Sequence, residues 1–161
     1  SELDKLVKEC KKGYEEYNFF IPAIAIREFT WNVFAAHYIE MVKARAYGID
    51  FSDEERDGAI FTLHKTLATI LKLLAPITPF ITEHLWKTLY SDQSIHKEKQ
   101  VNSENIEVQT DITKEISEFN SKVWNEKKSQ NLSLKDAIKI EIPEILQPFK
   151  KDLKSMHNLI D

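Results

Sequence analysis

Aromatic and basic side chains gather in one stretch of this chain, IREFTWNVFAAHYIEMVKARAYG, over residues 26 to 48. Unstacked RNA bases are held by aromatic rings and guanidinium planes, while lysine ammonium groups neutralise phosphates. The stretch offers these groups, with one carboxylate to accept hydrogen bonds from a base edge, at Arg27, Tyr38, Glu40, Lys43 and Arg45. The stretch is therefore a candidate surface for single-stranded RNA.

Packing inside a helical bundle is the alternative explanation of the same residues. At 3.6 residues per turn the stretch forms two stripes, and a central helix that contacts neighbours on two sides explains most of the aromatic side chains. The first stripe contains Ala23, Ile26, Thr30, Val33, His37 and Met41, and the second contains Arg27, Trp31, Phe34, Tyr38, Val42 and Arg45. We assign the first stripe to packing, favour packing for Trp31 and Phe34, and place RNA contact at residues 38 to 45.

Other kinds of site find little support. No histidine follows a glutamate by three residues and no His-Glu-x-x-His occurs, so we predict neither a metal site nor catalytic residues. The chain has 3 glycines, which excludes a glycine-rich loop for a nucleotide cofactor. Cys10 lies on an apolar stripe without an evident base, and we interpret it as a structural thiol.

Composition limits the class of protein. With 22 basic and 26 acidic residues the formal net charge is −4, so any contact with nucleic acid is expected to use local patches. A single cysteine and the lack of a long apolar run indicate a cytoplasmic protein without a membrane segment. The chain begins at Ser1 rather than methionine, and we expect a fragment of a longer protein.

Apolar periodicity predicts a mainly helical fold that positions these residues. Gly48 is expected to end the second helix, and Ser52, Thr78 and Asp111 are expected to cap later ones. We predict helices over residues 2–17, 19–47, 52–75, 80–90 and 111–128, and one more after Pro143. On the first helix, Lys5, Lys8 and Lys12 form a stripe, and we add them to the RNA-binding candidates as groups that steer a phosphate backbone.

Two segments depart from the helical pattern. Residues 91 to 110 are polar and read as a surface loop, with a possible short strand at 106–108. Isoleucines alternate with Lys139 and Glu141 over residues 138 to 142, which is the period of a half-buried strand. We therefore predict a helical bundle over residues 1–128, including the loop, and a small α/β appendage over residues 129–161.

The sequence also resembles a known family, through REFTWNVFAAHYIEMVKARAYG, LLAPITPFITEHLWKTLY and SIHKE. It is similar to the carboxy-terminal region of class I aminoacyl-tRNA synthetases of the valine, isoleucine and leucine group. These enzymes carry a Tyr-x-Glu-x-x-Lys pattern, here Tyr38, Glu40 and Lys43, and a kink before a tryptophan-bearing helix, here Pro76, Pro79, Phe80 and Trp86. The FTW, KARAY and SIHKE details are most similar to valine-specific, archaeal members. The resemblance is close over residues 14–98 and general from 111 onward.

The resemblance implies an anticodon-binding helical bundle that contacts the anticodon loop of a valine tRNA. The HIGH-type and KMSKS-type motifs are missing from this sequence. Catalysis and ATP use would therefore belong to another part of a parent chain, which we expect to be monomeric and whose catalytic domain would be a partner of this bundle. The alternatives are the same domain of an isoleucine or leucine enzyme, or a helical module whose aromatic stripe binds a partner helix.

Overall fold

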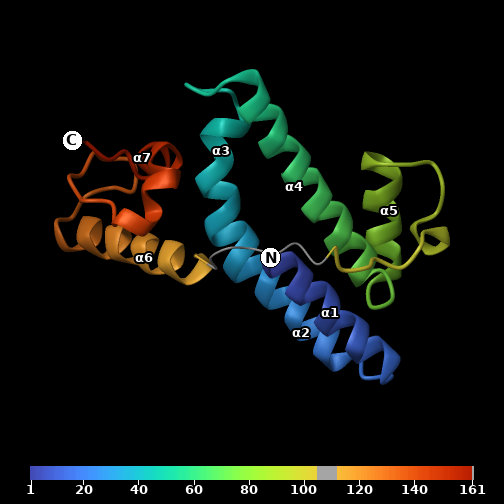
Figure 1. Cartoon of the computed structure of the whole chain (residues 1–161). Helices are drawn as coiled ribbons and strands as arrows, with labels where there is room; N and C mark the ends of the chain where they lie inside the picture. Colours follow the sequence, from blue (N-terminus) through green and yellow to red (C-terminus); the bar gives the residue numbers. More distant parts are fainter. Residues whose placement is uncertain (105–111, 161) are drawn as a thin grey trace. The chain divides into compact units, whose positions relative to one another are not determined.

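The computed structural model describes residues 1–104 and 112–160, and its architecture is helical (Figure 1). Contacts divide the chain into two compact units. Unit 1 comprises Ser1–Asn32 with Phe61–Gln109, and unit 2 comprises Val33–Ile60 with Thr110–Asp161. The predicted mainly-α fold class is confirmed. None of the described helices is long and apolar enough to cross a membrane.

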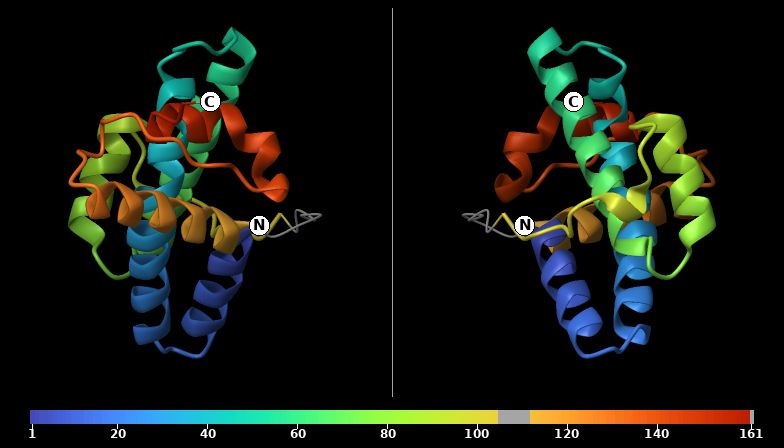
Figure 2. Two further views of the ribbon diagram at one scale, coloured as in Figure 1. Left: turned by 90° about the vertical axis from the view of Figure 1, so that its left-hand side faces the viewer. Right: turned by 90° about the vertical axis from the view of Figure 1, so that its right-hand side faces the viewer.

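Unit 1 is built on a tight helical hairpin of α1 (Glu2–Glu15) and α2 (Phe20–Glu28), which lie side by side in Figure 1 and Figure 2. A Cβ atom added at Gly13 would lie 2.6 Å from Cδ of Pro22, so the absence of a side chain permits this approach. The Tyr14 hydroxyl donates to the Leu73 carbonyl at 2.5 Å and joins the hairpin to the end of α4 (Asp53–Leu74).

The rest of unit 1 packs around the far end of α4. After the turn at residues 75–78 the chain enters α5 (Pro79–Leu89) and then the short 3-10 helix η2 (Ile95–Lys97). A buried cluster joins these elements, and it consists of Leu71, Ala75, Trp86 and Ile95. Pro79 stands at the first turn of α5, as predicted, because no intrahelical donor is needed there.

Unit 2 is assembled from helices far apart in sequence. It contains most of the π-helix η1 (Phe29–Ile39), then α3 (Glu40–Ala46) and the first turns of α4. It also contains α6 (Thr113–Ser129), the 3-10 helix η3 (Glu144–Phe149) and α7 (Lys150–His157), which packs against α3. Its interior includes fully buried polar side chains, namely Asn120, Lys127, Asp152 and His157.

The predicted helix over 19–47 forms, but its middle is a π-helix with wider turns than an α-helix. Because the two predicted stripes assume 3.6 residues per turn, they do not describe this segment. Phe34 is buried with 7% exposed, whereas Trp31, from the same predicted stripe, is 74% exposed. Gly48 ends the helical run with φ +69°, as predicted, in the left-handed region that glycine adopts readily.

The predicted strand at residues 138–142 is wrong. The segment forms one isolated bridge, between Ile138 and Leu159, and no continuous ladder. Strand-like alternation arises here because Ile138 and Ile142 are buried while the residues between them are more exposed. The predicted strand at 106–108 and the Asp111 cap lie outside the described residues. The boundary at residue 128 stays a prediction.

The starts of α4 and α5 differ in whether the expected side chain caps the helix. Ser52 caps α4 as expected, since its hydroxyl accepts from the Glu55 amide at 3.2 Å and the Ser52 amide donates to the Glu55 carboxylate at 2.8 Å. Thr78 precedes α5, but its side chain makes no cap hydrogen bond, and the predicted capping role of its hydroxyl is wrong.

Candidate nucleic-acid interface

The candidate residues of unit 1 lie on the surface of its helical hairpin. Lys5, Lys8 and Lys12 are exposed on α1, and Lys5 pairs with Glu2 at 2.6 Å. Arg27, near the end of α2, pairs with Glu28 at 2.5 Å while 68% of its side chain is exposed. Such exposed pairs are weak and exchange readily with other charged groups. These four cations are therefore accessible to an anionic partner.

Trp31 is a surface residue of unit 1, although the sequence favoured a packing role. Its ring is 74% exposed, four positions beyond Arg27. An exposed indole offers a flat apolar surface on which an unpaired base can stack. Trp31 and Phe34 therefore differ in burial, although the sequence pattern favoured packing for both.

Three candidates of unit 2 lie where η1 passes into α3. The Tyr38 ring is half-buried and stacks on Phe34, with centroids 6.0 Å apart and an interplanar angle of 16°. Glu40 and Lys43 are exposed, and the Lys43 ammonium donates to both Glu40 carboxylate oxygens at 3.1 Å. The structure thus brings Glu40 and Lys43 together, one turn apart on α3.

Arg45 differs from the other candidates because it holds a buried partner. Its Nε donates to Oδ1 of Asp152 at 3.0 Å and its Nη2 donates to Oδ2 of the same carboxylate. Asp152, on α7, is 1% exposed, whereas 30% of the Arg45 side chain is exposed. The hydrogen bonds to Asp152 raise the pKa of Arg45 above its ordinary value.

Phe51 extends this cluster. The Arg45 guanidinium carbon lies 5.3 Å from the centroid of the Phe51 ring, and the Lys151 ammonium lies 4.0 Å from the same centroid. Lys151 also pairs with Glu55 at 3.6 Å. Cation–π contacts of this kind orient a guanidinium as well as attract it. The cluster therefore attaches α7 to α3 and to the start of α4.

A second polar chain crosses the interior of unit 2. His157 Nε2 lies 2.7 Å from Oδ1 of Asn120, and Nδ2 of Asn120 lies 3.0 Å from Nδ1 of His37. Burial, followed by the charge of Lys127, lowers the pKa of His157 to about 4. Lys127 is 1% exposed and donates to the carbonyls of Leu134 and His157 at 2.6 and 2.7 Å. These groups satisfy one another, so the histidines are structural, as predicted for His37.

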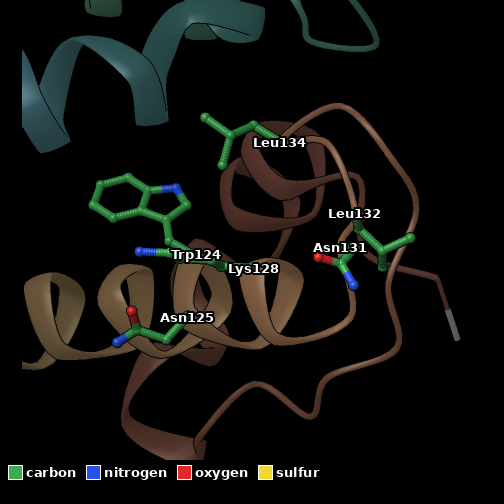
Figure 3. A pocket seen from close by; sticks show the side chains of 6 residues that line it. All are labelled: Trp124, Asn125, Lys128, Asn131, Leu132 and Leu134. Carbon is green, nitrogen blue, oxygen red and sulfur yellow. The ribbon is translucent and has the colours of Figure 1, made fainter.

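An open hollow lies beside α6 (Figure 3), and its lining consists of Trp124, Asn125, Lys128, Asn131, Leu132 and Leu134. One face of Trp124 is already occupied, because its ring stacks on His37 with centroids 5.6 Å apart. The lining contains no acid and base pair. In the described part of the chain, no three His, Cys, Asp or Glu side chains are grouped to hold a metal ion.

Cys10 is 0% exposed, and burial raises the pKa of its thiol to about 12. A thiol of this kind stays protonated at neutral pH and is a poor nucleophile. The interpretation of Cys10 as a structural thiol agrees with this burial.

Sequence reasoning missed Asp152 as the partner of Arg45. The two residues are separated by 107 positions. Asp152 sits in an ordinary lysine-rich amphipathic segment, KKDLKSMH, where an acidic residue near a helix N-terminus is unremarkable. No local pattern identifies such a pair, since the contact depends on how α7 packs on α3.

Comparison with known proteins identifies related chains. A family model described as the anticodon-binding domain of tRNA ligase matches residues 1–142. The valine-tRNA ligase of Pyrobaculum aerophilum is 37% identical over 99% of this chain and 20% of its own length. That of Aeropyrum pernix is 32% identical over 96% of this chain and 20% of its own length. That of Nanoarchaeum equitans is 40% identical over 81% of this chain and 17% of its own length. The chain spans about a fifth of the length of these relatives.

Proposed function

This chain belongs to the family of anticodon-binding domains of tRNA ligases, and on that premise we propose that it recognises the anticodon stem-loop of a tRNA. The observation that carries the proposal is the family match over residues 1–142, which includes every candidate RNA-binding residue. The exposed cations of unit 1 and of α3 support it, because a phosphate backbone needs positive charge at the surface.

The proposed division of labour follows from exposure. Lys5, Lys8 and Lys12 neutralise backbone phosphates, and Arg27 either contacts a phosphate or stacks on a base. On α3, the Lys43 ammonium leaves the Glu40 carboxylate and binds a phosphate. Glu40 then accepts hydrogen bonds from a base edge.

Flat surfaces for bases come from two further residues. Trp31 is the more accessible, and Tyr38 is half-buried with its ring stacked on Phe34. Stacking of a base on an aromatic side chain contributes roughly 1–3 kcal/mol whatever the base, so these residues would contribute strongly to the affinity for an unpaired loop.

The specificity that we propose is for valine tRNA. It rests on the names of the relatives, valine-tRNA ligases in each of the three cases given above. The parent protein would attach valine to its tRNA with ATP, in a catalytic domain that lies outside this chain and packs against it. We further propose that the parent is cytoplasmic and monomeric, and that this chain binds no cofactor of its own.

A titration of the purified chain with labelled anticodon stem-loops tests the function. We expect fluorescence anisotropy to show tighter binding of the valine stem-loop than of the isoleucine stem-loop. The logarithm of the binding constant is expected to fall linearly with the logarithm of salt concentration, with a slope of about −0.7 per neutralised phosphate of the loop. Equal affinity for both RNAs would remove support for valine, and no binding to either would contradict RNA recognition.

A role in protein binding is favoured by a different observation. Exposed aromatic rings lie in unit 1 near the α1–α2 turn and at the start of α5, namely Tyr17 at 86%, Phe20 at 73% and Phe80 at 90% exposed. Contiguous exposed apolar patches mark contact surfaces, and Tyr17 and Phe20 belong to the same turn between α1 and α2. A partner bound there would be nearly insensitive to salt, so the same titrations distinguish it from RNA.

A further inference from the structure

We propose that Asp152 is a positioning residue for RNA recognition: it holds the guanidinium of Arg45 so that the edge of Arg45 not bound to Asp152 is presented to a phosphate. The inference deepens the proposed function and rests on it, because it assigns a place to α7 within anticodon stem-loop binding. It also adds to the sequence hypothesis, which named Arg45 as an RNA-binding candidate without a protein partner.

The geometry of the pair leaves one edge of the guanidinium available. The Asp152 carboxylate accepts hydrogen bonds from Nε and Nη2 of Arg45. Nη1 does not take part in this bidentate contact. The carboxylate is 1% exposed, while 30% of the Arg45 side chain is exposed. The acidic group is therefore hidden from an approaching phosphate, and the accessible part of the pair is the cation.

A second contact, with the Phe51 ring, constrains the position of the guanidinium. Phe51 lies 5.3 Å from the guanidinium carbon, and Lys151, with 52% of its side chain exposed, lies 4.0 Å from the same ring. Two cations are thus held beside one aromatic side chain. Glu55 pairs with Lys151 at 3.6 Å, but 42% of its side chain is exposed, so solvent weakens that contact.

The contacts with Asp152 and Phe51 orient the Arg45 guanidinium. A buried ion pair is often no more stabilising than well-packed apolar side chains of similar size, so stability alone does not explain Asp152. A guanidinium recognises phosphate through a planar fork of donors, and it binds more tightly when its side chain is already ordered. Asp152 and Phe51 order the side chain of Arg45 before RNA arrives.

The test compares three variants for binding to the valine anticodon stem-loop at several salt concentrations. Asp152→Asn keeps the shape of the side chain and the charge of Arg45. We expect about 2- to 10-fold weaker binding, the effect of having to order one long side chain, with an unchanged salt slope. Arg45→Lys keeps the positive charge and loses the fork, and we expect a similar loss of affinity.

The third variant, Arg45→Met with Asp152→Leu, replaces the pair by apolar side chains and guards against unfolding of the single variants. We expect weaker binding together with a salt slope reduced by about 0.7, because one phosphate contact is lost. Glu118→Gln is the matched control, since it removes one carboxylate from an exposed pair of unit 2 in which 67% of Glu118 is exposed. Circular dichroism at the assay temperature confirms that each variant is folded.

The outcomes separate the two proposals. If the wild-type chain binds the RNA and Asp152→Asn binds it equally or more tightly, the positioning role is overturned. RNA recognition then still stands. A double variant with an unchanged salt slope would also overturn it, since Arg45 would then contact no phosphate. Failure of the wild-type chain to bind either RNA would overturn the proposed function and this inference together.

Discussion

Lys8 and Lys12 of unit 1 and the buried residues Lys127 and Asp152 of unit 2 use their charge in opposite ways. In unit 1, Lys8 and Lys12 are exposed on α1, and the hairpin is held by close apolar contact at Gly13. In unit 2, Lys127 and Asp152 are each 1% exposed and hold their helices together through hydrogen bonds. At these four positions a charged side chain serves the surface where it is exposed and the architecture where it is buried.

The largest expected effect distinguishes two cations of α3, Arg45 and Lys43, which lie two residues apart. Arg45→Ala leaves the buried Asp152 carboxylate without its partner, and we expect the free energy of unfolding to fall by roughly 3–5 kcal/mol. Lys43→Ala removes only an exposed partner of Glu40, and we expect a change of at most about 1 kcal/mol. Urea unfolding at neutral pH measures both, and equal losses would contradict the contrast between buried and exposed pairs.

The pH dependence of stability tests the polar interior of unit 2. His157 has a pKa of about 4 in the folded chain against an ordinary 6.5, so the unfolded chain binds a proton more readily between these values. Stability is therefore complete above pH 6.5 and decreases as the pH falls through this window, by on the order of 3 kcal/mol. The pKa of His37 is lowered by burial and acts in the same direction.

His157→Gln provides the control for that measurement. Glutamine keeps a donor for Asn120 and has no group that titrates. We expect urea unfolding of this variant to show a smaller loss of stability between pH 6.5 and 4 than the wild-type chain. An identical pH profile for the two proteins would assign the dependence to other groups.

Gly13 in unit 1 and Gly58 in unit 2 differ in how closely other atoms approach them. A Cβ atom at position 13 would meet Pro22 at 2.6 Å, whereas at Gly58 it would meet nothing within 4 Å. Gly13→Ala is expected to lower the free energy of unfolding by about 1–3 kcal/mol through overpacking. Gly58→Ala, inside α4, is expected to raise it by about 0.4–1 kcal/mol, because alanine restricts the unfolded chain. Thermal unfolding compares the two, and a destabilised Gly58→Ala would contradict this account.

The smallest effect on stability is expected for surface cations of unit 1. Replacing Lys8 and Lys12 together by alanine should change the free energy of unfolding by about 0.5 kcal/mol or less. The same double variant should reduce the salt slope of RNA binding by about 1.4, which is two contacts at 0.7 each. Lys114→Ala, with 81% of the Lys114 side chain exposed in unit 2, is the control that should leave the slope unchanged.

Local sequence was sufficient for most helices. Their apolar periodicity and Gly48 depend on short-range geometry, and the structure confirms them. The strand at 138–142 failed for an equally physical reason. Alternating burial requires only that one face of an extended segment be covered, whereas a strand requires a partner backbone, and only Ile138 finds one.

The candidate interface was predictable in its residue types but not in their surroundings. Exposure of Lys5, Lys8, Lys12 and Lys43 agrees with a role in phosphate binding, which remains a prediction. Trp31 is exposed and lies in the π-helix, whose wider turns a 3.6-residue periodicity does not describe. The pairing of Arg45 depends on a helix that follows it by more than a hundred residues.

The interleaving of the two units has a consequence for the order in which the chain is completed during synthesis. Residues Val33–Ile60 belong with Thr110–Asp161, so the first half of unit 2 emerges from the ribosome long before its second half. At roughly 5–20 residues per second, Met41 and Val42 wait several seconds for the segment that completes their unit. During that interval Asp152 has not been made, and Arg45 is a nascent-chain cation without its acceptor. Premature termination after residue 128 would make this incomplete state permanent.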